Sequence, residues 1–331
     1  MSEHPLRVAV VGCGGLGRRE AAIAAASSGV SVVAVCDARA ESAREVAAQL
    51  GPETQPYADY RAMIAATRPD AVLVVTPTHT HSEITVAAAQ AGAHVFCEKP
   101  MALNLEECDR MLAACRQAGV FLMLGFVRRF QPNYREMRCR LQAGEIGAPR
   151  LLQSVRMGGR PPVGIGGWRL EARQVGGLHS AYIHELDQLL WLGGPVKTVR
   201  GVANYGTFLD TDVEDSIWFL MEFENGAIGA MGSSQIYPVG WYELGVGGTE
   251  GSMAIRGGTT QVLVRKHGGA SETIELPNND AFVEELRHFF DCVRQGRTPS
   301  VTGEDGRASL EVVLAAYRSA RTGETVYLPL T

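Results

Sequence analysis

The chain has 331 residues, of which 46% are hydrophobic and 20% are charged, and its formal net charge at pH 7 is -5. This length and composition are typical of a folded protein with about two domains. An acidic chain lacks the basic surface that attracts nucleic-acid phosphates or anionic membranes, so we expect neither as a partner.

The first 125 residues alternate short apolar runs with segments rich in helix-forming residues, a pattern typical of successive β-α-β units. The predicted strands are residues 7–11, 30–36, 71–76, 94–97 and 120–125. The predicted helices are residues 18–26, 40–50, 60–66, 81–91 and 105–118. We therefore expect an α/β chain that opens with a doubly wound parallel sheet, the Rossmann type, in residues 1–125.

After Phe126 the pattern changes. A helix is predicted near residues 132–143, then a glycine-rich loop over 158–177 that we expect to be mobile, then a helix over 180–192. Alternating strands are predicted at 199–205, 216–224, 227–233, 242–247, 261–266 and 272–276, followed by helices at 281–294 and 304–320. Residues 126–331 are thus expected to form an α+β domain on a large, open, mostly antiparallel sheet that binds substrate and assembles the oligomer.

A nucleotide site is predicted where the first strand ends. The apolar run Val8–Val11 leads into Gly12-Cys13-Gly14-Gly15-Leu16-Gly17 and then into a helix. In a Gly-x-Gly-x-x-Gly turn, the first glycine permits the tight bend, the second admits the pyrophosphate and the third lets helix and strand pack closely. The free N–H groups of the helix N-terminus then face the phosphates.

The second predicted strand ends at Asp37, twenty residues after Gly17, where a carboxylate accepts hydrogen bonds from the adenosine ribose. Asp37 would repel a 2'-phosphate, which favours NAD. NADP use stays open because Arg39, two residues on, would offset part of that repulsion.

Several further segments carry a family resemblance. They are Thr76-Pro77-Thr78-His79-Thr80-His81, Glu98-Lys99-Pro100, residues 125–132, Gly176-Gly177, Ile183-His184-Glu185-Leu186-Asp187, residues 248–251 and residues 299–306. Together with the glycine turn they resemble the Gfo/Idh/MocA oxidoreductases, the family of glucose-fructose oxidoreductase and inositol dehydrogenases, over nearly the whole chain. The resemblance implies that Lys99 contacts the reacting hydroxyl and the nicotinamide ribose. It also implies that Glu98, Thr76, Pro77 and His81 belong to the loops around the cofactor.

Two residues are the predicted catalytic pair. Lys99 follows a parallel strand at the edge where doubly wound sheets bind ligands, and its ammonium can stabilise an alkoxide. His184 carries an imidazole, a group whose ordinary pKa is near neutral, and the resembling family has a catalytic histidine at this position. Ser180, His184, Asp187 and Gln188 recur at helical spacing and share one face, apart from the leucines of the same helix.

The chain also departs from its relatives. Sugar and inositol dehydrogenases of this type often carry Asp four residues before the histidine, where this chain has Ser180. Serine can bind a substrate hydroxyl but cannot orient the histidine with a charge. Arg128 matches a family position that touches substrate, although paired arginines also occur in solvated or interface clusters. The aromatic side chains of Trp168, Trp241 and Tyr242 could stack against a sugar ring, although aromatic residues in strands commonly belong to the core.

The reaction expected from these residues is hydride transfer between NAD(P) and a secondary or anomeric alcohol of a cyclic polyol or sugar. Two other classes stay open: an NAD-dependent glycoside-cleaving enzyme that oxidises the sugar transiently, and a non-catalytic nucleotide-sensing regulator on the same scaffold. Neither a metal site nor a nucleophilic serine has the residue spacing it requires.

The surroundings of the protein are also predicted. The seven cysteines are scattered and form no Cys-x-x-Cys pair, which suits a reducing compartment. The sequence shows no export signal and no apolar stretch of about 18 residues. We therefore expect a soluble cytoplasmic protein. The open sheet, with Trp218, Phe219 and Met221 among its strands, is expected to bury one face against helices and the other in a homodimer or homotetramer.

Overall fold

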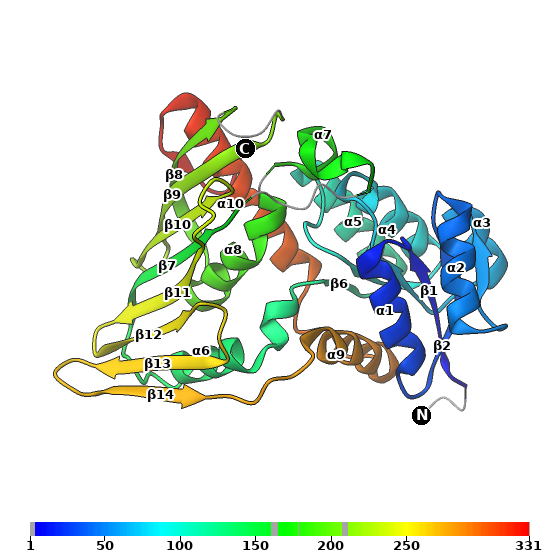
Figure 1. Cartoon of the computed structure of the whole chain (residues 1–331), viewed down its shortest axis with the longest axis horizontal. Helices are drawn as coiled ribbons and strands as arrows, with labels where there is room; N and C mark the ends of the chain where they lie inside the picture. Colours follow the sequence, from blue (N-terminus) through cyan, green and yellow to red (C-terminus); the bar gives the residue numbers. More distant parts are fainter. Residues whose placement is uncertain (1–3, 160–164, 178, 207–210, 331) are drawn as a thin grey trace. The chain divides into compact units, whose positions relative to one another are not determined.

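The computed structural model describes residues 4–159, 165–177, 179–206 and 211–330; the side chains at positions 165, 166, 170 and 179–181 lie outside this description. The chain divides into two compact units (Figure 1). The first runs to Val127 and takes in Ala281–Arg307, and the second comprises Arg128–Asp280 and Ala308–Thr331.

The first unit contains a six-stranded parallel sheet in the order β3-β2-β1-β4-β5-β6, which is the doubly wound arrangement. Its strands are β1 (Leu6–Val11), β2 (Val30–Cys36), β3 (Gln55–Tyr57), β4 (Ala71–Val74), β5 (His94–Cys97) and β6 (Leu122–Leu124). Its helices are α1 (Gly15–Ala26), α2 (Ala40–Leu50), α3 (Tyr60–Thr67), α4 (His81–Gln90), α5 (Leu105–Ala118) and α9 (Ala281–Gln295), with a 3-10 turn at Thr78–Thr80.

Local sequence accounts for these elements. The central strands are apolar and fully buried, as strands covered by helices on both faces must be; Val8, Val10, Val72 and Val95 are 0% exposed. Helix α5 begins where the Asn104 side chain accepts the Glu107 N–H at 2.9 Å. It ends at Gly119, whose φ of 68° suits a glycine. Strand β3 was not predicted, because three residues that include Pro56 carry no periodic pattern.

The first unit extends beyond the predicted border at residue 125. Helix α9, which the sequence assigned to the second domain, belongs to the first unit instead. The Phe289 ring of α9 lies 5.8 Å, centroid to centroid, from the Phe96 ring of β5. Packing of its apolar face, rather than its place in the sequence, decides where α9 belongs.

The second unit contains a nine-stranded mixed sheet in the order β14-β13-β12-β11-β7-β10-β9-β8-β15. Its strands are β7 (Pro149–Met157), β8 (Val196–Tyr205), β9 (Glu214–Phe223), β10 (Ile228–Ser234), β11 (Trp241–Gly248), β12 (Gly251–Arg256), β13 (Gln261–Lys266), β14 (Ser271–Glu275) and β15 (Val326–Tyr327). The helices are α6 (Pro132–Gln142), α7 (Ala172–Val175), α8 (His179–Gly193) and α10 (Gly303–Thr322), whose first turns belong to the first unit.

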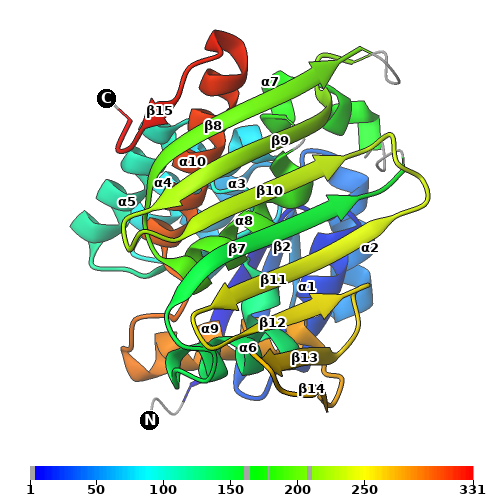
Figure 2. The same cartoon turned by 90° about the vertical axis from the view of Figure 1, so that its left-hand side faces the viewer.

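The sheet of the second unit has one covered and one open face. Along β9, Ile217, Phe219 and Met221 are buried, whereas Trp218 and Leu220 are 42% and 62% exposed. Helices α8 and α10 lie along the covered face (Figure 1), and Figure 2 shows the strands in front of these helices. The alternation is typical of a sheet with one face packed on helices.

Two predictions for the second unit need correction. Strands β7, β12 and the two-residue β15 were missed, and β7 lies at the centre of the sheet, parallel to β10 and antiparallel to β11. The predicted glycine-rich loop contains a 3-10 helix, Ile165–Leu170, and the short helix α7; its residues 160–164 lie outside the described ranges. None of the described helices is both long and apolar enough to cross a membrane.

Candidate functional site

The glycine turn between β1 and α1 has the shape that a dinucleotide needs. Gly12 has a φ of 104°, and a Cβ there would collide with the Val75 carbonyl. A Cβ on Gly17 would collide with the Gly12 carbonyl, so the contact between turn and helix requires glycine. At Gly14 and Gly15 a Cβ would meet nothing within 4 Å. The turn therefore leaves open space in front of the N-terminus of α1, which fits a pyrophosphate.

Asp37 at the end of β2 is tied to this turn. Its Oδ2 accepts the Cys13 N–H at 2.8 Å, and its Oδ1 accepts the Arg39 N–H at 2.8 Å. A carboxylate has about four acceptor positions, so hydrogen bonds to a ribose remain available. The Arg39 Nε lies 3.9 Å from Oδ1, and its side chain is 56% exposed. Asp37 and Arg39 thus lie together beside the predicted adenosine site.

The loops after β4 and β5 leave the sheet at the same edge, because these parallel strands pair directly, Val74 beside Cys97. The first loop contains Thr76 and Pro77, held by the Thr80 hydroxyl, which donates to the Pro77 carbonyl at 2.8 Å and lies 2.7 Å from the Thr76 hydroxyl. The second contains Glu98 and Lys99. This is the edge at which doubly wound sheets bind ligands.

Glu98 is 5% exposed, and its Oε2 accepts the Lys99 N–H at 3.1 Å. A Cβ on Gly125 would lie 2.6 Å from Glu98 Oε1, so the glycine makes room for this carboxyl group. Lys99 itself is half-buried, whereas the other two lysines, Lys197 and Lys266, are exposed.

Glu20, on the buried face of α1, was missed by sequence reasoning. It is 0% exposed and neighbours Glu98. Burial and the Glu98 carboxyl group raise the pKa of Glu20 well above its ordinary value. The folded chain therefore keeps the Glu20 carboxyl group protonated to a higher pH than the unfolded chain does. A signal was available, since Glu20 is three residues after Gly17, which places both on the same face of the helix.

His81, predicted to belong to the cofactor loops, lies at the start of α4 and is 1% exposed. Its Nε2 lies 2.8 Å from the Thr76 carbonyl oxygen and its Nδ1 lies 2.9 Å from the Pro100 carbonyl oxygen. Both ring nitrogens are thus directed at backbone groups of the two loops.

The predicted residues of the second unit gather around α8. His184 is 9% exposed, and Asp187, predicted to face substrate, is 0% exposed. The Arg129 guanidinium binds Asp187 through its Nε and Nη2 at 2.5–3.1 Å. Leu186 and Leu189 are fully buried as well. Both faces of α8 are therefore buried, and Asp187 takes part in an ion pair.

Arg128, adjacent in sequence, is the centre of a second polar cluster. Its Nη2 lies 2.7 Å from Glu185 Oε1, and its Nη1 donates to the Tyr242 hydroxyl at 2.7 Å and the Tyr134 hydroxyl at 3.2 Å. The two tyrosine hydroxyls are hydrogen-bonded to each other. Burial raises the pKa of both tyrosines, so they stay protonated at neutral pH. Tyr134 and Glu185 were not predicted, because only the fold brings them to Arg128.

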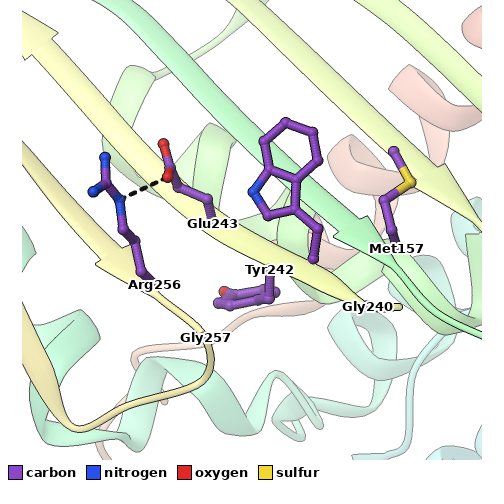
Figure 3. Close-up of a pocket in the computed structure, with 7 residues that line it drawn as sticks. Met157, Gly240, Tyr242, Glu243, Arg256 and Gly257 are labelled. Atoms are coloured by element: carbon purple, nitrogen blue, oxygen red, sulfur yellow. Dashed lines mark hydrogen bonds and ion pairs between the residues drawn. The ribbon is translucent and has the colours of Figure 1, made fainter. Parts of the chain in front are cut away.

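The three aromatic residues predicted to contact a sugar ring, Trp168, Trp241 and Tyr242, differ in exposure and in contacts. Trp168 is half-buried, with the Arg169 guanidinium 5.1 Å from its ring centroid. Trp241 is 49% exposed, whereas Tyr242 is directed at Arg128. Figure 3 shows the pocket at this end of β11, in which Glu243 accepts from Arg256 Nε at 2.8 Å. The Ser180 side chain lies outside the described residues.

The structure thus places the predicted cofactor residues and Lys99 in the first unit, and His184, Arg128 and Asp187 in the second. Across the described ranges, no three His, Cys, Asp or Glu side chains gather as metal ligands would.

Comparison with known proteins agrees with this division. Residues 6–126 match the Gfo/Idh/MocA profile described as "Oxidoreductase family, NAD-binding Rossmann fold", and residues 138–328 match "Oxidoreductase family, C-terminal alpha/beta domain". A scyllo-inositol 2-dehydrogenase (NAD(+)) of Bacillus subtilis is 34% identical over 98% of this chain and 97% of its own length. A myo-inositol 2-dehydrogenase of Thermotoga maritima is 31% identical, with 98% of each chain covered.

A crystal structure of an aldose-aldose oxidoreductase from Caulobacter crescentus superposes with a TM-score of 0.88 at 30% identity, covering 98% of this chain and all of that one. Both domain matches, the full-length relatives and the glycine turn agree with the resemblance inferred from the sequence. The chain belongs to the Gfo/Idh/MocA family of oxidoreductases and is an NAD(P)-dependent dehydrogenase whose first unit is the NAD-binding Rossmann domain.

Proposed function

We propose that this dehydrogenase transfers hydride between NAD and a ring alcohol of a cyclic polyol or sugar, with inositols as the first candidates. The observation that carries the proposal is the position of Lys99. It follows β5, at the same sheet edge as the glycine turn and Asp37, and it is the half-buried lysine of the three in the chain. The full-length similarity to inositol 2-dehydrogenases supports the substrate class.

The proposed chemistry assigns a role to each unit. When bound, NAD accepts the hydride from the substrate carbon. The Lys99 ammonium stabilises the negative charge that grows on the substrate oxygen as its proton leaves. The His184 imidazole takes that proton, a role that suits a group titrating near neutral pH. Arg128 and its tyrosine partners, Trp168 and Ser180 are proposed to line the substrate site.

We propose NAD rather than NADP as the preferred cofactor. The Asp37 side chain is 15% exposed beside the glycine turn, and a carboxylate there repels a 2'-phosphate. Arg39 extends from the same loop and offsets part of this repulsion, so NADP should bind more weakly but not be rejected.

The test is a panel of inositols, pyranoses and deoxy or anhydro sugars, followed by NADH absorbance. The wild type should form NADH with at least one inositol, and Lys99→Met and His184→Asn should each lower kcat by about 100-fold or more. Lys197→Met is the matched control, because Lys197 is exposed on β8 of the second unit. Cleavage of a glycoside without NADH accumulation would instead indicate transient oxidation, and tight NADH binding without turnover would indicate a sensor.

We also propose that the chain forms homodimers or homotetramers through the open face of the nine-stranded sheet. Figure 2 looks onto this face of the sheet. Besides Trp218 and Leu220, the face exposes Val202, Ile228 and Leu151 at 68%, 57% and 42%. Contiguous exposed apolar side chains of this kind mark interaction surfaces. Light scattering should give a dimer or tetramer that Leu220→Asp dissociates and Val283→Asp, an exposed valine of α9, does not.

We propose a cytoplasmic location on the basis of the cysteines. All seven are free thiols. Such a set suits a reducing compartment. Fractionation of the native host with a cytoplasmic marker enzyme tests this, and recovery with secreted proteins would contradict it.

A further inference from the structure

His81 joins the two loops on which the proposed chemistry depends. Thr76 follows β4, and Pro100 follows Lys99 at the end of β5. The imidazole spans the two, with Nε2 at 2.8 Å from the Thr76 carbonyl oxygen and Nδ1 at 2.9 Å from the Pro100 carbonyl oxygen. The ring is 1% exposed, so water does not compete for these contacts.

Backbone pairing alone does not fix these loops. The β4–β5 ladder runs as far as Val74 beside Cys97, and past it the Glu98 N–H donates to the Val74 carbonyl. Thr76 and Lys99 thus lie beyond the last rung of the β4–β5 ladder. The His81 side chain adds a contact to each loop past that point.

We propose that His81 is a positioning residue: its ring fixes the Pro100 carbonyl relative to the Thr76 loop, and so fixes the backbone that places the Lys99 side chain. The effect on catalysis rests on the proposed role of Lys99, whereas the effect on the position of Lys99 does not. A buried ring with a carbonyl oxygen beside each nitrogen is suited to orientation, because displacing the loop that accepts the ring N–H would leave a buried polar group unsatisfied.

The protonation state of the His81 ring determines how many hydrogen bonds it can donate to the two loops. Burial lowers the pKa of His81, although backbone hydrogen bonds at Thr76, Pro100 and Met101 favour the charged form; the charge of His79 disfavours that form. A neutral ring carries one N–H, so at neutral pH it donates to one of the two carbonyls. Positioning of Lys99 requires the contact to Pro100, so the proposal places the ring N–H on Nδ1, 2.9 Å from the Pro100 carbonyl oxygen.

Amide substitutions separate the two contacts. In His81→Asn the amide nitrogen lies near the place of Nδ1, and in His81→Gln it lies near the place of Nε2; His81→Leu removes both. With NAD and myo-inositol, His81→Leu should lower kcat by about 10- to 100-fold, since small misplacements of a reacting group have effects of this size. His81→Asn should recover most of the rate, His81→Gln should recover little, and the KM for myo-inositol should change less than threefold (about half a decade) in all three.

His79→Asn is the matched control, because His79 is two residues away and exposed. A purely structural role would lower Tm in all three His81 variants and leave kcat per folded enzyme unchanged, and that result would overturn the proposal. The same holds if His81→Gln, rather than His81→Asn, restores the rate.

A second readout does not depend on turnover. An amine-reactive ester labels Lys99 and the exposed Lys197 in one sample, and mass spectrometry follows both rates. His81→Leu should change the labelling rate of Lys99 by severalfold and leave that of Lys197 unchanged. If the wild type oxidises no polyol but the Lys99 rate shifts, the proposed function fails and the positioning role stands; an unchanged Lys99 rate overturns the positioning role itself.

Discussion

Replacing Glu20 by glutamine removes one of two carboxyl groups that the first unit buries next to each other. Glu20 is 0% exposed on α1, and its neighbour Glu98 is 5% exposed beside Lys99. Burial and the Glu98 carboxyl group raise the pKa of Glu20 well above 4.5, so folding favours the protonated form of this carboxyl group. Glutamine has nearly the same shape and carries no group that ionises in this pH range.

The sign of the effect follows from proton linkage. Above its ordinary pKa of 4.5, the carboxyl group of Glu20 is ionised in the unfolded chain but still protonated in the folded one. The stability that it contributes is fully present below that pH and is lost as pH rises towards the folded pKa, by at most about 1.4 kcal/mol per pH unit. Over the two units from about pH 5 to about pH 7, the loss can reach about 2.7 kcal/mol.

Urea unfolding of both proteins at several pH values between about 5 and 8 measures this loss. The free energy of unfolding of Glu20→Gln, relative to wild type, should increase as pH rises and level off above the folded pKa. Glu106→Gln is the control, because Glu106 is 83% exposed on α5. A difference between Glu20→Gln and wild type that is constant across this pH range would refute a raised pKa for Glu20.

Three further substitutions test other parts of the structure. Gly17→Val places a side chain against the Gly12 carbonyl and displaces the turn, so NADH affinity per folded protein, measured by fluorescence, should fall by about 100-fold or more; unchanged affinity would contradict the proposed turn. Asp37→Ser should weaken NADH binding by about 10-fold and reduce the preference over NADPH, whereas an unaltered preference would remove Asp37 from the ribose site. Asp187→Ala leaves Arg129 buried with its charge uncompensated, so urea unfolding should show a loss of about 3–5 kcal/mol; a loss below about 1 kcal/mol would mean that the pair is hydrated.

The parts of the molecule that the sequence predicts best are those whose signal is local. Strand β2 and helix α5 begin and end at the predicted residues, because an apolar run bounded by turns and a capped amphipathic helix are complete within their own segments. The glycine turn and Asp37 are likewise defined by spacing along a single β-α-β unit, and the structure gives them the expected shape.

The remaining features depend on contacts between distant segments. Strand β7 is central in its sheet, but it carries the inward-facing polar Ser154, which interrupts the apolar alternation. The ion pair of Arg129 and Asp187 joins residues 58 positions apart, and each looked like a surface or substrate group when taken alone. The assignment of α9 to the first unit likewise depends on the packing of Phe289, which no local pattern contains.

The most direct test of the account is the fate of the hydride. Wild-type enzyme is incubated with NAD and myo-inositol deuterated at every ring carbon, and the reduced cofactor is analysed by mass spectrometry and NMR. If hydride passes directly from a ring carbon to NAD, one deuterium should appear at C4 of the nicotinamide for each inosose formed. The rate should be slower than with unlabelled myo-inositol. Reduced cofactor without deuterium, or none with any polyol or sugar of the panel while NADH still binds, would contradict it.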